Sequence, residues 1–336
     1  MDDRPSVKLF LAPMATLSHE ALRRSVERFG GCDEYYTEMI HAPSLVAGGR
    51  FESCYLRRGP APEKLRWQLT GNRADSLARA ARLVSRLGGA GVDLNMGCSA
   101  PEIYRSGGGI AWMLKPRGET LGMVRQVRQA LDGSPGGKLP LSVKLRLGDE
   151  SFGEDDFFDF CDALAAEGVE RIVLHPRTRR EKYRKAPRWE AVGRLAEHAA
   201  GRFTVVLNGA VSDRGSLLAA LGAAPGIEAV MVGRAAAQMP WVFRDLRAVL
   251  DGSPEPLPRI DLLQTALAFL TDLEECQPEE FWPTRRRRFF EYFCANVAFR
   301  HYLFTKIRGA KTNGEARDAL VEYFEKSPGE RYAGAR

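Results

Sequence analysis

Short apolar runs recur along the first 250 residues, and amphipathic stretches separate most of them. Eight runs have the length of strands: Val7–Ala12, Asp33–Met39, Leu65–Leu69, Gly91–Asn95, Leu141–Arg146, Arg171–His175, Phe203–Asn208 and Ile227–Val232. The clearest of them, Thr204–Leu207 and Ala229–Val232, are almost entirely apolar. This pattern is typical of parallel strands that are buried on both faces.

The stretches between these runs have the pattern of amphipathic helices. Ser18 can cap a helix that ends at Gly30–Gly31, and Ser212 with Asp213 opens another. Eight strand–helix units in roughly 250 residues match the size of a TIM barrel. A doubly wound sheet is the alternative, although it usually has fewer strands.

A proline-rich segment, 251–258, separates these units from a region with a helical pattern. Within 259–336 we expect helices over Leu262–Leu273, Arg285–Thr305 and Glu315–Glu325. The predicted fold is therefore α/β: a TIM (β/α)8 barrel over residues 1–250, a linker over 251–258 and a small all-helical C-terminal domain.

The composition is that of a soluble globular protein, with 44% hydrophobic and 27% charged residues. No apolar run approaches ~18 residues, so we expect no membrane span. The N-terminus lacks the apolar region of a signal peptide, which predicts a cytoplasmic protein. The six cysteines contain no Cys-x-x-Cys pair, so their spacing indicates neither a metal site nor a disulfide framework.

In a TIM barrel the chemistry lies at the carboxyl ends of the strands. The small or polar residues at those ends are Pro13, Met14, Ala15, Glu38, Gln68, Asn95, Cys98, Lys144, Arg146, His175, Arg177, Asn208, Gly209, Gly233 and Arg234. Cys98 comes just after a strand and before the glycines at 107–109, where a thiol can donate a proton to a bound substrate. A lone cysteine is more often a packing residue.

The last two strand ends are typical of a phosphate site. Gly209 and Gly233 allow backbone N–H groups to approach an anion, and Arg234 adds a positive charge. Lys144 alternates with apolar neighbours, so it points into the barrel, where it needs an anionic or electron-accepting partner. Together these features favour FMN. Asn208–Gly209 could instead be only a turn, and His175 a core histidine.

Two basic stretches contain aromatic residues. Eight Lys/Arg lie between Arg177 and Arg194, with Tyr183 and Trp189 among them. Eight more lie between Arg285 and Lys311, beginning with Arg285, Arg286, Arg287 and Arg288. A charge run is usually a solvated helix face. Two such stretches near one candidate site, with a net charge of +6, favour a nucleic-acid surface.

These residues resemble the motifs of the tRNA-dihydrouridine synthases. The matching segments are Leu11–Met14, Thr37–Glu38, Gln68–Leu69 with Gly71, Asp93–Cys98, Val143–Gly148, His175–Thr178, Asn208–Gly209 and Gly233–Arg234. The details around Gly91–Asn95 and Ser106–Gly109 are most similar to the bacterial branch that modifies position 16 of the D-loop. Ser99 stands where the family usually has proline, and Pro176 where it usually has glycine or alanine.

The resemblance implies an enzyme that reduces uridine in tRNA with FMN and NADPH, with Cys98 as the proton donor. It implies that the FMN-binding residues are Pro13, Met14, Ala15, Gln68, Lys144, His175, Asn208, Gly209, Ala210, Gly233 and Arg234. The expected tRNA contacts are Glu38, Asn95, Arg146, Arg177 and Arg285 to Arg288. We expect the protein to bind tRNA, to bind neither DNA nor a membrane, and to be a monomer.

Two other functions remain open. One is an FMN-barrel oxidoreductase that reduces a free small molecule, such as a pyrimidine or an enone, and it predicts turnover without RNA. The other is an RNA-binding barrel that has lost catalysis, for which Ser99 is the only hint.

Overall fold

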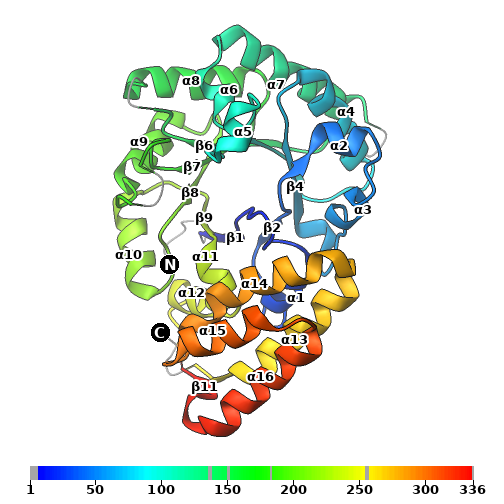
Figure 1. Ribbon diagram of the computed structural model, residues 1–336. Helices are drawn as coiled ribbons and strands as arrows, with labels where there is room; N and C mark the ends of the chain where they lie inside the picture. Colours follow the sequence, from blue (N-terminus) through cyan, green and yellow to red (C-terminus); the bar gives the residue numbers. More distant parts are fainter. Residues whose placement is uncertain (1–6, 135–137, 150–151, 182–183, 254–256, 335–336) are drawn as a thin grey trace.

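The computed structural model describes residues 7–134, 138–149, 152–181, 184–253 and 257–334. Within these ranges eight parallel strands close into a barrel, in the order β1-β2-β4-β5-β6-β7-β8-β9 and back to β1 (Figure 1). The strands are β1 (Lys8–Leu11), β2 (Glu34–Tyr36), β4 (Leu65–Thr70), β5 (Gly91–Met96), β6 (Leu141–Arg146), β7 (Arg171–His175), β8 (Thr204–Asn208) and β9 (Ala229–Val232). The predicted TIM barrel is confirmed, and closure excludes the doubly wound alternative.

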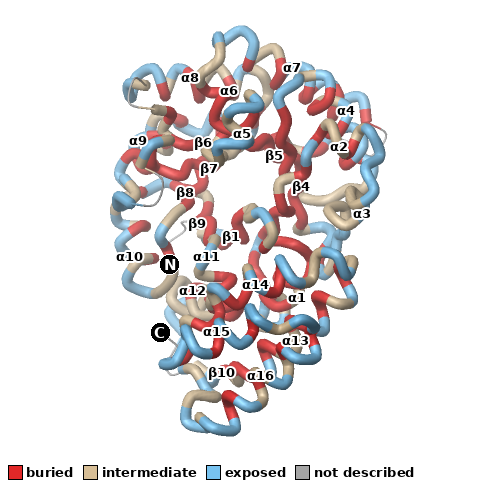
Figure 2. Tube along the Cα trace, viewed as in Figure 1, coloured by how far each residue is buried: buried red, intermediate tan, exposed pale blue. Residues whose placement is uncertain are grey.

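Each barrel strand lies within, or one residue beyond, a run read from the apolar pattern. β4 and β5 are buried at every position, as expected of strands covered on both faces. Figure 2 shows buried residues along the strands and exposed residues on the outer faces of the helices. A short strand, β3 (Ile40–His41), pairs with the end of β4 and was not predicted.

Helices surround the barrel, and short ones line the loops at its rim. They are α1 (Glu20–Glu27), α2 (Ala42–Val46), α3 (Glu52–Tyr55), α4 (Ala74–Ser85), α5 (Pro101–Arg105), α6 (Ala111–Leu114), α7 (Arg117–Asp132), α8 (Glu154–Ala166), α9 (Trp189–Ala199), α10 (Arg214–Ala223), α11 (Arg234–Gln238) and α12 (Val242–Leu250). Asp213 caps α10 through a capping box with Ser216, as predicted for this helix start.

The predicted capping role of Ser18 is wrong. Helix α1 begins at Glu20, and its N-cap position is occupied by His19, which makes no side-chain cap bond. The Ser18 hydroxyl instead accepts a hydrogen bond from the Met14 backbone N–H at 2.8 Å. Ser18 therefore stabilises the loop after β1, and no side chain caps the start of α1.

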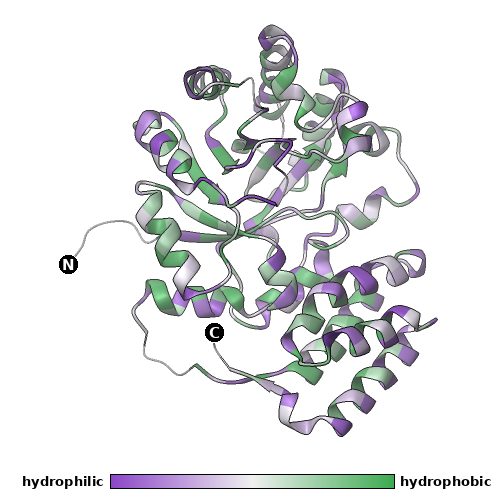
Figure 3. Ribbon diagram, turned by 60° about the vertical axis from the view of Figure 1, so that its left-hand side comes forward, coloured by the Kyte–Doolittle hydropathy of each residue, from purple (hydrophilic) through white to green (hydrophobic). Residues whose placement is uncertain are grey.

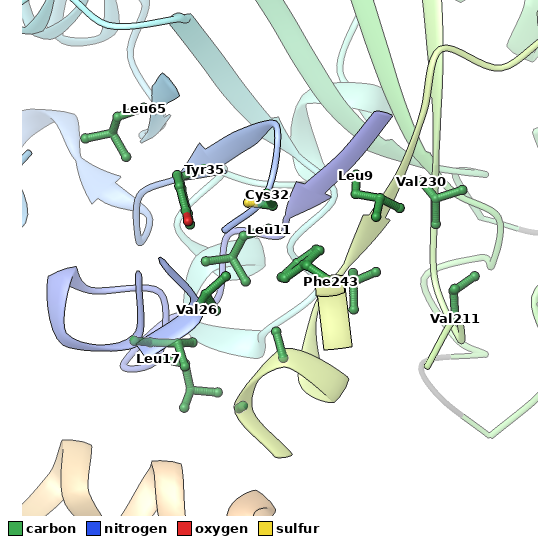
Figure 4. Close-up of a cluster of buried hydrophobic side chains, with 14 of the residues drawn as sticks. Leu9, Leu11, Leu17, Val26, Cys32, Tyr35, Leu65, Val211, Val230 and Phe243 are labelled. Carbon is green, nitrogen blue, oxygen red and sulfur yellow. The ribbon is translucent and has the colours of Figure 1, made fainter. Parts of the chain in front are cut away.

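The outer core lies between the strands and the helices. Figure 4 shows Leu9 and Leu11 of β1 packed with Val26 of α1 and Phe243 of α12. All four side chains are at most 1% exposed. Burial of this apolar surface, at about 25 cal/mol per Å², holds α1 and α12 against the barrel wall.

Ion pairs close the amino-terminal end of the barrel interior. Arg66 Nε lies 2.5 Å from Glu34 Oε1, and Arg171 donates to Glu34 at 2.9 Å and to Glu228 at 2.8 Å. Arg66 and Glu34 are buried, and Arg171 lies across the face of the Phe10 ring. Two carboxylates and two guanidiniums thus neutralise one another where the strands begin.

The C-terminal region is helical, with α13 (Leu262–Cys276), α14 (Trp282–Phe293), α15 (Arg300–Gly309) and α16 (Asn313–Lys326). The prediction of one helix over Arg285–Thr305 is wrong, because the chain leaves the helix after Phe293. Asn296 stabilises this break by donating to the Phe293 and Gln238 carbonyls at 2.8 and 2.7 Å. Hydrophobic and hydrophilic residues alternate around these helices (Figure 3).

This helical region packs against one side of the barrel. Helix α13 lies along α1, where Arg28 donates to Asp272 at 2.8 Å and Arg24 to Glu275 at 2.7 Å. Strands β10 (Ile260–Asp261) and β11 (Tyr332–Ala333) pair antiparallel, so the region's two ends meet. Residues 254–256 of the expected linker lie outside the described residues. No described helix is long and apolar enough to cross a membrane.

Candidate active site

The loop after β5 carries Cys98 at the carboxyl rim of the barrel. The Asn95 side-chain carbonyl accepts hydrogen bonds from the backbone N–H groups of Cys98 at 2.9 Å and Gly97 at 3.3 Å. The Cys98 carbonyl in turn accepts from the Ile110 N–H at 3.0 Å. A Cβ at Gly109 would lie 2.5 Å from that carbonyl, so glycine is needed there for the loop to close.

Ser99 lies between two points at which this loop is held. Pro101, two positions later, is the first residue of α5, where proline's fixed φ favours a helix start. The loop is thus held by Asn95 on one side and by Pro101 on the other.

Cys98 is half-buried, and its thiol stays neutral. Burial raises the pKa of Cys98, and this effect outweighs the backbone hydrogen bond at Ala100 and the positive charge of Arg146, which lower it. A neutral thiol can donate a proton without an activating base, in contrast to a nucleophilic cysteine.

Two cations stand beside this loop on the adjacent strand. In the β5–β6 register Lys144 lies opposite Asn95, and in the β6–β7 register Arg146 lies opposite His175. Burial and the neighbouring Arg146 charge lower the pKa of Lys144 to about 8. The described residues include no salt bridge to Lys144, although the nearby carboxylate of Asp93 acts to raise its pKa. Arg146 Nε donates to the Gly97 carbonyl at 3.0 Å.

His175 is held in one protonation state by its neighbours. Arg177 Nη1 lies 2.8 Å from His175 Nε2. Because a guanidinium only donates hydrogen bonds, Nε2 is the acceptor and the ring proton is on Nδ1. Burial and the surrounding cations, Lys144 first, lower the pKa of His175 to about 2. A Cβ at Gly209 would lie 2.8 Å from the His175 ring, so a glycine there admits the imidazole.

Arg177 is itself an internal residue, which corrects its expected position on the substrate surface. It is 4% exposed, and its Nε donates to the Lys185 carbonyl at 2.6 Å. Its guanidinium therefore joins His175 to the loop after β7. Lys182 and Tyr183 of the same basic stretch lie outside the described residues.

The residues of the expected phosphate site lie where the ends of β1, β8 and β9 meet. The Ala12 N–H donates to the Val232 carbonyl at 2.8 Å, which brings the Pro13–Ala15 loop beside Gly233. A Cβ at Gly233 would meet only Ala12 and Met14 atoms, at 3.5 Å.

The same rim continues along β8. Asn208 Nδ2 donates to the Met231 carbonyl at 2.8 Å, and Trp189 Nε1 donates to the Gly209 carbonyl at 2.9 Å. Ala210 and Arg234 are exposed beside them. Small residues and one exposed cation thus line a rim that suits an anion.

Glu38 lies at this rim but faces away from solvent. Its carboxylate accepts a hydrogen bond from the Thr16 backbone N–H at 2.6 Å and pairs with Arg285 of α14 at 3.0 Å. Glu38 and Arg285 are 4% and 2% exposed. Burial raises the pKa of Glu38, although Arg285 acts in the opposite direction.

The run Arg285 to Arg288 is therefore not one solvent-facing surface. Arg286 is 3% exposed and donates to the Asn313 side chain at 2.7 Å. Arg287 is exposed, and half-buried Arg288 pairs with Glu291 at 2.8 Å. The helix turn places two of the four side chains inward, so only Arg287 and Arg288 remain candidates for direct contact with tRNA.

Asp93, for which no role was predicted, is buried beside two of the predicted site residues, Gln68 and Asn95. Asp93 accepts hydrogen bonds from Gln68 at 2.8 Å and from the Ser142 hydroxyl at 2.5 Å. Its signal was available in the sequence, because Asp93 and Asn95 are two residues apart on one strand and so share a face.

Comparisons with known proteins agree with this geometry. The model of the dihydrouridine synthase (Dus) family matches residues 10–306. The chain is 35% identical over 257 residues to a probable tRNA-dihydrouridine synthase of Rhodobacter capsulatus, covering 74% of this chain and 73% of that protein. It is 29% identical over 318 residues to the tRNA-dihydrouridine(16) synthase of Aquipseudomonas alcaligenes, covering 90% and 95%.

Among solved structures, KGPDC from Streptococcus mutans in complex with D-R5P matches with a TM-score of 0.50 and 15% identity, covering 75% of this chain and all of that chain. At this identity the match supports the barrel fold alone.

Proposed function

The chain belongs to the tRNA-dihydrouridine synthase family of flavin-dependent oxidoreductases, and from this premise we propose that it reduces the uridine at position 16 of the tRNA D-loop. Relatives named tRNA-dihydrouridine(16) synthase, one covering 90% of the chain, support the choice of position. The product is 5,6-dihydrouridine.

The observation that carries the proposal is the neutral Cys98 thiol on an anchored loop, with Lys144 and Arg146 on the next strand. Reduction of the uracil C5=C6 bond requires a hydride at C6 and a proton at C5. The S–H bond of Cys98 breaks as the C5–H bond forms, and solvent returns a proton to the thiolate. The positive charges of Lys144 and Arg146 stabilise the negative charge that develops on the uracil ring.

The residues at the rim fit FMN. The half-buried glycines Gly209 and Gly233, the exposed cation Arg234 and the Lys144 ammonium supply the donors that a phosphate and an electron-rich ring system require. The residues that would hold the cofactor are Pro13, Met14, Ala15, Gln68, Lys144, His175, Asn208, Gly209, Ala210, Gly233 and Arg234. Bound there, FMN reduced by NADPH would supply the hydride to C6.

The substrate must leave its RNA stack to reach Cys98. Extrusion of a base costs a few kcal/mol, which contacts to phosphates offset. Asn95 and Arg146 would hold the uracil edge. Exposed Arg287 and half-buried Arg288, together with the exposed aromatic rings of Phe299 and Tyr302, offer charges and stacking surfaces on the helical region.

The test is to incubate the purified protein with NADPH and tRNA that lacks dihydrouridine, and to map reduced uridines by position. We expect reduction at position 16 by the wild-type protein and a large loss in Cys98→Ala, with flavin and tRNA binding retained. Cys54, which is half-buried and outside this loop, provides the matched control Cys54→Ala.

Turnover of a free pyrimidine or enone at the rate seen with tRNA would favour the small-molecule alternative. Bound flavin and NADPH oxidation without reduced tRNA would refute the proposed substrate. Reduction at another uridine would refute position 16 alone.

A further inference from the structure

A row of buried hydrogen bonds runs through the barrel interior to the backbone of Cys98. Ser142 and Gln68 donate to the two oxygens of Asp93 at 2.5 and 2.8 Å. Asn95 Nδ2 donates to Gln68 Oε1 at 2.9 Å, and Asn95 Oδ1 accepts from the Cys98 N–H at 2.9 Å. Asp93, Gln68 and Ser142 are 0% exposed and Asn95 is 8% exposed, so water cannot replace most of these partners.

This row has a direction, because each amide has a donor end and an acceptor end. The Asp93 oxygen that faces Gln68 accepts, so the Gln68 NH₂ group turns toward it and the Gln68 carbonyl turns toward Asn95. The Asn95 NH₂ group then meets Gln68, which leaves its carbonyl for the Cys98 N–H. Reversal of Gln68 would set two oxygens against each other at Asp93 and two NH₂ groups against each other at Asn95. If Asn95 then turned as well, its NH₂ group would face the Cys98 N–H.

We propose that Asp93 is a positioning residue that fixes both amides and, through them, the loop that carries Cys98. The inference rests on the proposed function, because its consequence is proton delivery from that loop. It also sets the polarity of substrate recognition. Since the Asn95 carbonyl is occupied by backbone N–H groups, Asn95 offers the substrate an N–H donor, which suits a uracil carbonyl oxygen.

The structure suggests a set of nearly isosteric variants. In Asp93→Asn the amide keeps its oxygen toward Gln68, because its NH₂ group finds an acceptor in the Ser142 hydroxyl. That hydroxyl is itself 3.5 Å from the Val92 carbonyl, to which it can donate. The double variant Asp93→Asn/Ser142→Ala lacks this acceptor, so the amide at 93 loses its preferred orientation. Ser142→Ala alone retains the carboxylate, which still accepts from Gln68.

The four proteins are compared in two single-turnover reactions: reduction of bound flavin by NADPH, and reoxidation of that flavin by tRNA lacking dihydrouridine. Relative to Asp93→Asn, the double variant is expected to lose about tenfold or more in reoxidation by tRNA, as for a lost buried hydrogen bond. Its flavin reduction is expected to match that of Asp93→Asn, which carries the same charge.

A second readout needs neither flavin nor tRNA. Alkylation of Cys98 by iodoacetamide, followed by peptide mapping, reports how firmly the loop is held. We expect faster alkylation in the double variant than in either single variant, with the rate at Cys54 unchanged.

Equal reoxidation rates and equal Cys98 alkylation in Asp93→Asn and in the double variant would overturn the positioning role. So would a loss in the double variant that is only the product of the two single losses. If the wild-type protein leaves tRNA unreduced while alkylation follows the expected order, the positioning role stands and the proposed function fails.

Discussion

The buried pair between Glu38 and Arg285 gives a sharp prediction, because it joins the barrel rim to α14. In Arg285→Met the Glu38 carboxylate, 4% exposed, would keep its Thr16 N–H and the more distant charge of Arg23 but lose the guanidinium that pairs with it. Removal of one partner of a buried ion pair costs ~3 to 5 kcal/mol. For 336 residues the entropy of unfolding is about 0.7 kcal/mol/K, so Tm should fall by about 4 to 7 °C.

The assay is thermal unfolding followed by circular dichroism, with Arg287→Met as the matched control. Arg287 is exposed two positions away on the same helix, so its replacement should change stability by at most ~0.5 kcal/mol. The double variant Arg285→Met/Glu38→Gln should recover much of the loss, because glutamine removes the unpaired charge and still accepts from Thr16.

The same reasoning fixes the pH dependence. Burial raises the pKa of Glu38, and Arg285 opposes this rise. Without Arg285 the pKa rises further, and the folded protein then takes up a proton more readily than the unfolded chain. The deficit of Arg285→Met should therefore shrink as pH falls through the raised pKa of Glu38. Equal Tm losses in Arg285→Met and Arg287→Met, or no recovery in the double variant, would refute the buried-pair reasoning.

Three further predictions concern the site. Lys144→Ala should purify with less flavin than the wild-type protein. Because the pKa of Lys144 is lowered to about 8, the flavin affinity of the wild-type protein should fall above that pH as the positive charge is lost. Titration followed by flavin fluorescence checks both expectations. Arg177→Met should remove the hydrogen bond that fixes the His175 tautomer, raise the pKa of His175 by removing a nearby cation, and weaken flavin binding. An unchanged titration of His175 by NMR would contradict the contact. Arg287→Glu should weaken tRNA binding roughly tenfold at low salt and less at high salt in a filter-binding assay, since phosphate contacts release counterions; an affinity equal to wild type would remove α14 from the tRNA surface.

The barrel could be read from the sequence because its strands are buried on both faces. A short apolar run such as Ala229–Val232 is typical of a strand covered on both faces, and the recurrence of eight such runs favoured the barrel. β3 escaped detection because two residues, Ile40–His41, are too few to set a period. The break after Phe293 escaped it because the helical pattern continues across Asn296, whose side chain satisfies the carbonyls at the helix end only in the folded chain.

The candidate site was predictable where chemistry follows strand ends, and less so where partners come from far along the chain. Lys144 and Arg146 follow from alternation within one strand. The inward direction of Arg285 does not, because Glu38, which pairs with it, is separated from it by most of the barrel sequence. Asp93 was visible as a polar residue on an inward face, but its two partners, Gln68 and Ser142, are fixed only by the strand register.

The ion pairs at the amino-terminal end of the strands bear on the order of events in turnover. Glu34, Arg66, Arg171 and Glu228 form a buried or part-buried ion-pair cluster at that end, opposite the rim that carries Cys98, so the rim is the expected route to the interior. A nicotinamide reductant and a transfer RNA would then bind across the same rim, one after the other. Steady-state velocities should accordingly give parallel lines in double-reciprocal plots, the signature of a double-displacement scheme in which each partner departs before the other arrives.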